Sequence, residues 1–229
     1  FNGLGAYSMV ALINVQGQNL YTSIPLSALL TAIISIPIAF IAFRLRGSYF
    51  AIGTWVLADV VSLVMQQQES LGAGNGVSIK VSGDAADRLR MIYWLALAVA
   101  VGAIALSYGV LRSRLGLQMQ AIRDSEGGAK ALGANVYRTR FVAWVVAAFW
   151  IGLTGAIFYL ANLRVQPKDS FSVVNWTAPI VVIVVIGGIG TIEGPILGVI
   201  VFFALRELLA GFGSWYLIAL GAVAVATKH

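Results

Sequence analysis

One acidic side chain interrupts a long apolar stretch of this chain. Asp59 lies in YFAIGTWVLADVVSLVMQ, residues 49–66, about ten residues, or roughly 15 Å by helix rise, from the start of that stretch. A carboxylate at this depth in a membrane is costly unless it faces protein or a water-filled path. It is therefore a candidate for a functional residue of a translocation path. Alternatively, it only makes a buried hydrogen bond between packed helices, or it lies nearer the outer surface than the segment bounds indicate.

A glycine-rich segment, GGIGTIEGPILG at 187–198, is the second candidate. Three of its glycines recur every four residues, a spacing that lets helices approach closely: Gly190, Gly194 and Gly198. Gly187, Gly188 and Pro195 favour a sharp turn or a broken helix instead. A broken helix beside a translocation path exposes backbone groups that bind polar solutes, although a plain turn is the simpler explanation of any single glycine. From these two stretches we assign seven residues to a possible translocation path: Tyr49, Phe50, Thr54, Asp59, Gly187, Gly188 and Gly190.

Catalysis is not expected from the residue types present. The chain has no cysteine, and its single histidine is its last residue, His229. An intramembrane serine protease needs a histidine in the membrane, and an aspartyl protease needs a second carboxylate facing Asp59. No phosphate-binding or dinucleotide-binding glycine motif occurs. We therefore predict a protein that is not an enzyme and that has no cofactor or metal site.

A polar stretch at 112–140 is the third candidate, with six basic and two acidic side chains. Five apolar residues in it follow helical spacing and predict one face of a helix: Met119, Ile122, Ala129, Leu132 and Val136. Gly127 and Gly128 are expected to break this helix in the middle, because each glycine costs about 1 kcal/mol of helix propensity relative to alanine. The pattern indicates one or two short amphipathic helices, although charged loops are often partly helical.

The elements that carry these residues are predicted to be membrane helices. Hydrophobic residues make up 59% of the chain, charged residues 10%, and the mean hydropathy is +0.89. Such a chain requires lipid as its solvent. Eight hydrophobic segments are expected: 1–15, 24–43, 49–66, 91–111, 141–162, 172–190, 196–210 and 212–226. The fold class is thus an all-α, polytopic membrane protein, with residues 1–229 forming a single transmembrane domain.

The distribution of basic residues predicts the orientation of the chain. Placing 44–46, 112–140 and the C-terminus inside puts nine Lys and Arg there and six outside, as the positive-inside rule favours. The net charge of +6 is scattered through short loops, so no nucleic-acid partner is expected. The long polar stretch is predicted to face the cytoplasm.

Several stretches resemble one family of transporters. GLQMQAIRDSEGGAKALGANVYRTRFVAW at 116–144 closely resembles the cytoplasmic loop of the permease subunits of branched-chain amino-acid ABC importers, the LivM-like permeases. Further matches follow in the family's order: NGLGAY at 2–7, RLRGSYFAIGT at 44–54, GNGV at 74–77 and VVIGGIGTIEGPILGV at 184–199. Two features depart from the family: a Gly-Gly pair replaces a more apolar pair at 127–128, and the first spans and the usual C-terminal end are missing.

This resemblance implies a role and partners. The chain would be the permease of an ATP-driven importer in a bacterial or archaeal cytoplasmic membrane, translocating branched-chain or related amino acids through the lipid bilayer. Its partners would be cytoplasmic ABC ATPases, a second permease subunit and an extracellular solute-binding protein. The ATPase-coupling residues would be Ile122, Arg123, Asp124, Glu126, Ala129, Leu132 and Gly133. The alternatives are a stand-alone channel, a secondary transporter, or a sugar-type ABC permease.

Overall fold

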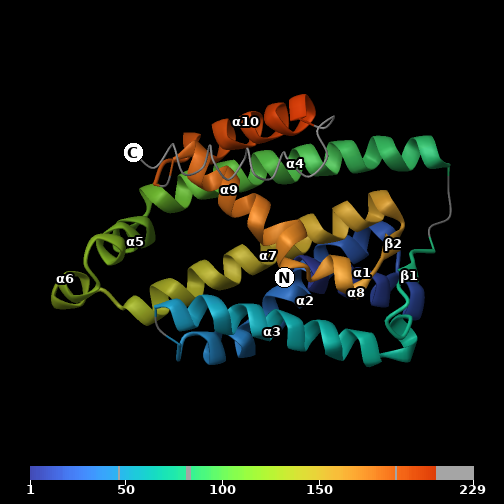
Figure 1. Ribbon diagram of the computed structural model, residues 1–229, viewed down its shortest axis with the longest axis horizontal. Helices are drawn as coiled ribbons and strands as arrows, with labels where there is room; N and C mark the ends of the chain where they lie inside the picture. Colours follow the sequence, from blue (N-terminus) through green and yellow to red (C-terminus); the bar gives the residue numbers. More distant parts are fainter. Residues whose placement is uncertain (46, 81–83, 189, 210–229) are drawn as a thin grey trace. The chain divides into compact units, whose positions relative to one another are not determined.

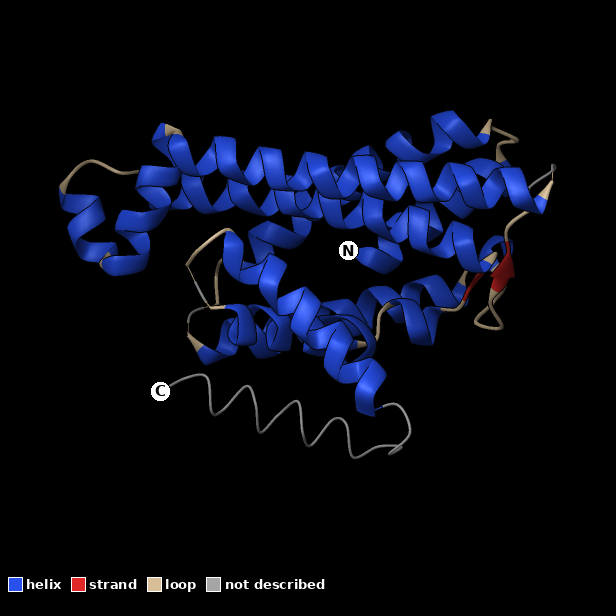
Figure 2. Ribbon diagram, turned by 90° about the horizontal axis from the view of Figure 1, so that it is seen from above, coloured by secondary structure: helices blue, strands red, loops and turns tan. Residues whose placement is uncertain are grey.

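A computed structural model describes residues 1–45, 47–80, 84–188 and 190–209 of the chain. These residues form two compact units, Phe1–Phe171 (unit 1) and the residues from Ser172 onward (unit 2). Almost all described residues are helical, and the strands form one short two-stranded sheet (Figure 2). The all-α fold class predicted from the sequence is confirmed.

The described residues of unit 1 form eight α-helices, two other short helical turns and two short strands, most of which are labelled in Figure 1. In chain order they are α1 (Asn2–Val10), the π-helical turn η1 (Ala11–Val15), α2 (Leu20–Ala42), α3 (Ser48–Gln67), the 3₁₀ turn η2 (Glu69–Leu71), β1 (Val77–Ser78), α4 (Ala85–Arg112), α5 (Arg114–Asp124), α6 (Glu126–Ala131), α7 (Val136–Asn162), β2 (Arg164–Val165) and α8 (Pro167–Ser170). Four of these helices, α2, α3, α4 and α7, are long and apolar enough to cross a membrane. They coincide with four of the predicted segments.

The core of unit 1 is the contact of α1 and α2 with α7. Along α2, four fully buried hydroxyl side chains recur every four residues: Ser23, Ser27, Thr31 and Ser35. Each hydroxyl donates a hydrogen bond of 2.7–2.9 Å to a carbonyl of its own helix or cap. These side chains are short, and their hydroxyl groups are already hydrogen-bonded to their own helix or its cap. The backbones of neighbouring helices can therefore approach closely without leaving a polar group unpaired.

Glycines complete this close packing. A Cβ added at Gly152 of α7 would lie 2.7 Å from Thr31, and one added at Gly5 of α1 would overlap the backbone of Gly152. Gly155 likewise faces the backbone of Asn2. The glycines of the NGLGAY stretch therefore serve helix packing, which explains their spacing in the sequence.

The two ends of unit 1 have different architectures (Figure 1). We call one end the basic end; it consists of the α2–α3 connection, α5, α6 and the start of α7. Leu45 and Gly47 of the connection line one pocket together with Lys130 and Arg140. The prediction that the two basic loops lie on the same side is therefore confirmed.

The opposite end, which we call the sheet end, is formed by η1, η2, β1 and β2. The strands pair antiparallel, with Val77 opposite Val165 and Ser78 opposite Arg164. Asn14 of η1 makes two hydrogen bonds to the backbone at the end of β1, and we call this pair of bonds the Asn14 clamp. Its Nδ2 donates to the Ser78 carbonyl at 2.9 Å, and its Oδ1 accepts from the Lys80 amide at 3.1 Å. The clamp joins segments more than sixty residues apart in the chain.

Unit 2 comprises η3 (Val173–Thr177), α9 (Ala178–Gly187) and α10 (Glu193–Leu209). These elements match the predicted segments 172–190 and 196–210, although α10 begins three residues earlier than expected. The last predicted segment, 212–226, lies outside the described residues.

Candidate functional site

The polar stretch at the basic end folds into two helices rather than one broken helix. Ser125 ends α5 with an extended backbone (φ −159°, ψ 112°) and caps α6 by accepting a hydrogen bond from the Gly128 amide at 3.1 Å. Gly127 and Gly128 both lie inside α6. The prediction that this glycine pair breaks the helix is wrong, because a serine three residues before Gly128 provides both the break and the next N-cap.

The predicted single apolar face is consequently wrong as well. Ala129 is 2% exposed and Val136 is 6% exposed, whereas Leu132 is 86% exposed. Met119 and Ile122 of α5 are half-buried. The turn at Ser125 resets the helical phase, so the five residues do not share one direction. Ala129 is buried within the chain itself, and Leu132 is the one residue of this set with a largely exposed apolar side chain.

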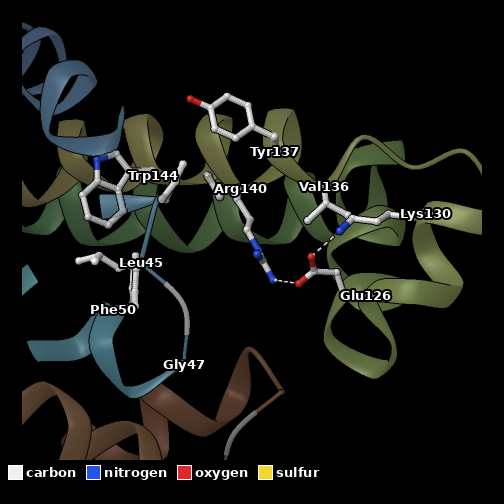
Figure 3. Close-up of a pocket in the computed structure, with 11 residues that line it drawn as sticks. Leu45, Gly47, Phe50, Glu126, Lys130, Val136, Tyr137, Arg140 and Trp144 are labelled. Carbon is white, nitrogen blue, oxygen red and sulfur yellow. Dashed lines mark hydrogen bonds and ion pairs between the residues drawn. The ribbon is translucent and has the colours of Figure 1, made fainter. Parts of the chain in front are cut away.

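Glu126 is the centre of the polar contacts at this end. One carboxylate oxygen bonds Lys130 Nζ at 2.8 Å within α6, and the other bonds Arg140 Nη2 of α7 at 2.8 Å (Figure 3). The hydrogen bonds from Lys130 and then Arg140, together with their charges, lower the pKa of Glu126 below its ordinary value. All three side chains are well exposed, so solvent and salt weaken the pairs.

A second link joins α5 to α7 in a buried position. Thr139 is 1% exposed, and its hydroxyl donates to Gln118 Oε1 at 2.8 Å. Asn135 caps the same end of α7 by accepting a hydrogen bond from the Arg138 amide at 3.0 Å. The two short helices are thus attached to the first two turns of a membrane-spanning helix at separate points, so a displacement of α5 and α6 acts on α7 directly.

An aromatic cluster lies beside these links and connects α7 to the ends of α2 and α3. Trp144 meets Phe43 edge-on at a centroid distance of 5.5 Å and Phe50 at 6.2 Å. Its indole nitrogen donates to the Ser35 carbonyl at 3.1 Å. Tyr137 contacts Phe43 at 5.8 Å. The start of α7 is thereby fixed to both neighbouring spans.

Aromatic and ionic residues together line one pocket of about 800 Å³. Figure 3 shows Trp144, Phe50 and Leu45 on one side of it and the Glu126–Arg140 pair on the other. The RLRGSYFAIGT stretch forms its wall at the start of α3, where Leu45 lies against Gly53. The pocket thus separates the α2–α3 connection from α6.

The remaining predicted coupling residues are exposed. Arg123 and Asp124 form an ion pair with each other at 3.2 Å, with both side chains at least 60% exposed. Gly133 follows α6 in a left-handed conformation (φ 82°), which is usual after the C-terminus of a helix. The structure therefore brings Glu126, Lys130 and Arg140 together and leaves Arg123, Asp124, Leu132 and Gly133 facing outward.

The predicted path residues of α3 divide between two faces. Phe50 is half-buried in the aromatic cluster, and Thr54 is half-buried with its hydroxyl donating to the Ala51 carbonyl at 2.9 Å. Tyr49 is 75% exposed, and Asp59 is exposed near the middle of the helix. These four residues do not form one surface.

The predicted path glycines belong to unit 2. Gly187 ends α9, and Gly188 and Gly190 adopt positive φ values of 98° and 107° in the turn that follows. A Cβ at Gly187 would overlap the Gly194 carbonyl, and one at Gly198 would overlap that of Ile183. The segment is thus both a sharp turn and a close contact between two helices.

Three residues that build the basic end were absent from the sequence prediction: Arg140, Thr139 and Trp144. The Glu126–Lys130 pair could have been found from its four-residue spacing. The Glu126–Arg140 pair joins residues on either side of a turn and a helix cap, so no regular spacing in the sequence predicts it. No cluster of three or more His, Cys, Asp or Glu residues suited to a metal occurs in the described residues.

Comparison with known proteins places the chain in a family. A family model described as a permease component of the branched-chain amino acid transport system matches residues 1–227. No solved structure matches.

Three curated relatives are permease proteins named LivM. The high-affinity branched-chain amino acid transport system permeases of Salmonella typhimurium and Escherichia coli are 28% and 27% identical over 98% of this chain and 59% of their own length. A probable branched-chain amino acid transport permease of Methanocaldococcus jannaschii is 23% identical over 72% of this chain and 49% of its own length. The chain thus spans about three-fifths of the first two relatives. It belongs to the family of branched-chain amino-acid transport permease components.

Proposed function

We propose that this chain is the membrane permease of an ATP-driven importer for branched-chain or related amino acids, and that its basic end receives the ATPase. The observation that supports this most directly is the attachment of α5 and α6 to α7 through Glu126–Arg140 and Gln118–Thr139. A force applied to these short helices reaches a membrane-spanning helix through two specific contacts.

Leu132 is the proposed anchor for the ATPase. It is 86% exposed at the end of α6, and a large apolar side chain in that position loses its contact with water when a partner covers it. Arg123 and Asp124, at the end of α5, are also exposed. An apolar anchor with charged residues around it is the usual composition of a protein–protein contact.

The membrane faces fit the rest of the proposal. α3 and α4 carry exposed apolar side chains along their length, as expected of helices that meet lipid or a second permease subunit. The Lys and Arg count places the basic end in the cytoplasm. A solute-binding protein would then approach the sheet end, from outside a bacterial or archaeal cytoplasmic membrane.

The test compares the same substitution at the two ends. The full-length permease would be co-expressed with ABC ATPase subunits from the same genome, as wild type, Leu132→Arg or Leu89→Arg. Leu89 is also an exposed leucine, 55% accessible, but it lies near the start of α4. We expect Leu132→Arg to reduce ATPase co-purification about tenfold or more, as loss of an interface anchor does, and Leu89→Arg to leave it unchanged.

Membrane insertion and the elution volume in detergent control for misfolding. If Leu132→Arg retains both the ATPase and amino-acid uptake, the basic end is not the docking surface. Uptake by the permease without any ATPase would instead favour a stand-alone channel or a secondary transporter.

A further inference from the structure

The outward face of α3 carries an ionisable group in the middle of a membrane span. Asp59 lies about 16 Å from Ser48 and about 12 Å from Gln67 by helix rise. One turn away on the same face are Trp55, 56% exposed, and Leu63, 58% exposed. This face is therefore not covered by the other described residues of unit 1.

Lipid is a poor neighbour for this face. A carboxylate near the centre of a span is stable when it faces protein or water, and the apolar residues around Asp59 give it no partner on α3. A purely lipid-facing helix has no need of an acidic residue at this depth. The face must therefore border a water-accessible path or another polar group.

Polar residues continue from Asp59 toward the sheet end. Ser62 and Gln66 follow at spacings of three and four residues, on the edge of this face that turns toward the chain: Ser62 is 7% exposed and Gln66 is half-buried. Gln66 Nε2 donates to Ser62 Oγ at 3.3 Å. Beyond them the helix ends in the exposed residues Gln67 and Gln68.

The other direction along the helix is apolar. Toward the basic end the same face presents Ile52, Trp55 and Val56, each more than half exposed. The carboxylate thus lies between the apolar half of α3 at the basic end and the half that carries Ser62, Gln66 and Gln67 toward the sheet end. A solute that enters from that end meets Asp59 as the first charge on α3.

The residue types around Asp59 define the chemistry of a ligand. A carboxylate pairs with an organic cation, and an exposed indole one turn away attracts the same cation through its ring face. Val56 and Leu63 offer aliphatic surface next to it, which suits an apolar group close to the charge. A hydrophobic amino acid carries both groups, an ammonium and an aliphatic side chain, on its α-carbon.

We propose that Asp59 binds the ammonium group of the amino acid during translocation, with Trp55, Val56 and Leu63 beside its aliphatic side chain. This inference rests on the proposed importer function and adds to it the residue that recognises the solute. It also explains why a single acidic residue lies among apolar ones on a surface of α3 that the other described residues of unit 1 leave open.

Cysteine labelling tests the position of the ligand, because the native chain has no cysteine. Leu63→Cys leaves Asp59 in place, whereas Val60→Cys introduces a thiol that points about 100° away from Asp59 on the helix. The complete importer in membranes would be treated with a water-soluble thiol reagent in the presence of leucine or of 4-methylpentanoate, which is leucine without its ammonium group. We expect labelling of Leu63→Cys that leucine slows and 4-methylpentanoate does not, and labelling of Val60→Cys, also exposed at 49%, that neither compound slows.

Removal of the charge completes the test. In the Asp59→Asn, Leu63→Cys double variant, leucine should no longer protect the thiol. In reconstituted vesicles with the binding protein and ATPase, Asp59→Asn should reduce leucine uptake about tenfold or more, as loss of a desolvated charge pair does, and Asp59→Glu should restore much of it. ATPase co-purification should be unchanged in both variants.

The outcomes separate this inference from the proposed function. If wild type imports leucine and Asp59→Asn imports it equally well, or if leucine protects the thiol equally with Asn at 59, the role of Asp59 is overturned and the importer stands. Loss of ATPase binding in Asp59→Asn would show a structural role and would also overturn it. If the wild-type complex hydrolyses ATP but imports no amino acid, both proposals fail.

Discussion

The two ends of unit 1 are held together by different kinds of interaction. At the sheet end, backbone pairs between β1 and β2 and the two hydrogen bonds of Asn14 join distant segments. At the basic end, one exposed ion pair, Glu126–Arg140, ties α6 to α7, and Glu126 forms a second exposed pair with Lys130 inside α6. Backbone ladders have fixed geometry, whereas exposed ion pairs break and re-form at little cost.

This difference matches what each end would do in an importer. In an importer, the basic end would have to move when the ATPase moves. It combines weak, exposed ion pairs with a pocket of about 800 Å³ that leaves room for such a movement. The sheet end would act as a fixed plate that keeps the ends of α1, α3 and α7 in register. Three substitutions test the comparison, beginning with the largest expected effect.

Gly76→Val should be the most damaging, because it attacks the sheet end through the backbone. Gly76 has φ +84°, and an added Cβ would lie 2.9 Å from the Val165 carbonyl of β2. A β-branched residue with this φ angle and a steric clash with a backbone atom is expected to lower the free energy of unfolding by about 2 kcal/mol or more. The midpoint of thermal unfolding in detergent should fall by several degrees.

Gly17→Val is the matched control for this strain. Gly17 also has a positive φ, +65°, but nothing lies within 4 Å of an added Cβ. Its substitution should lower the free energy of unfolding only by the cost of the positive φ angle, because there is no steric clash. Equal loss of stability in both variants would mean that the contact with β2 contributes little and that the sheet end is not a rigid plate.

Asn14→Ala should have an intermediate effect. It removes the bonds to Ser78 and Lys80, and two such hydrogen bonds contribute about 1–2 kcal/mol together. Asn162→Ala removes a bond of similar length, 2.9 Å, but one that stays within a single helix. The midpoint of thermal unfolding should fall more for Asn14→Ala than for Asn162→Ala. The opposite order would mean that the Asn14 hydrogen bonds stabilise the protein no more than a bond within one helix.

Of the three substitutions, Glu126→Gln should change thermal stability least and the coupling of ATP hydrolysis to import most. The ion pairs it removes are exposed, so the unfolding midpoint should remain within error of the wild type. The number of solute molecules imported per ATP hydrolysed should fall, because α6 loses its contact with Arg140. Glu69→Gln is the control, since Glu69 lies in η2 at the sheet end and takes part in none of the ion pairs of the described residues.

The same pairs predict a pH dependence of α6. Because folding lowers the pKa of Glu126, the contribution of its pairs is complete above the ordinary value of 4.5 and is lost as the pH falls through the lowered pKa. Hydrogen exchange of the α6 amides should therefore be slower in wild type than in Glu126→Gln at neutral pH. The difference should vanish in acid and shrink in about 1 M salt, where screening acts over roughly 3 Å. A difference that persists under both conditions would contradict this account of the basic end.

The sequence alone determined the broad features of this protein. Mean hydropathy and segment length predicted the all-α membrane fold and the four long spans, because a bilayer demands about 20 apolar residues in each spanning helix whatever its neighbours are. The spacing of the basic loops predicted that they lie at the same end, since alternating spans return the chain to the same side. The motifs at 44–54 and 116–144 indicated the family.

The tertiary structure decided the contacts within those features. Ser125, and not the Gly127–Gly128 pair, turned out to separate α5 from α6, because a side-chain cap outweighs glycine's weak preference against helix. The phase change at that turn buried Ala129 and exposed Leu132, which periodicity had placed together. The Glu126–Arg140 pair and the Asn14 clamp join residues that have no regular spacing along the chain. Local patterns fix which segments become helices, but only packing brings distant side chains within bonding distance.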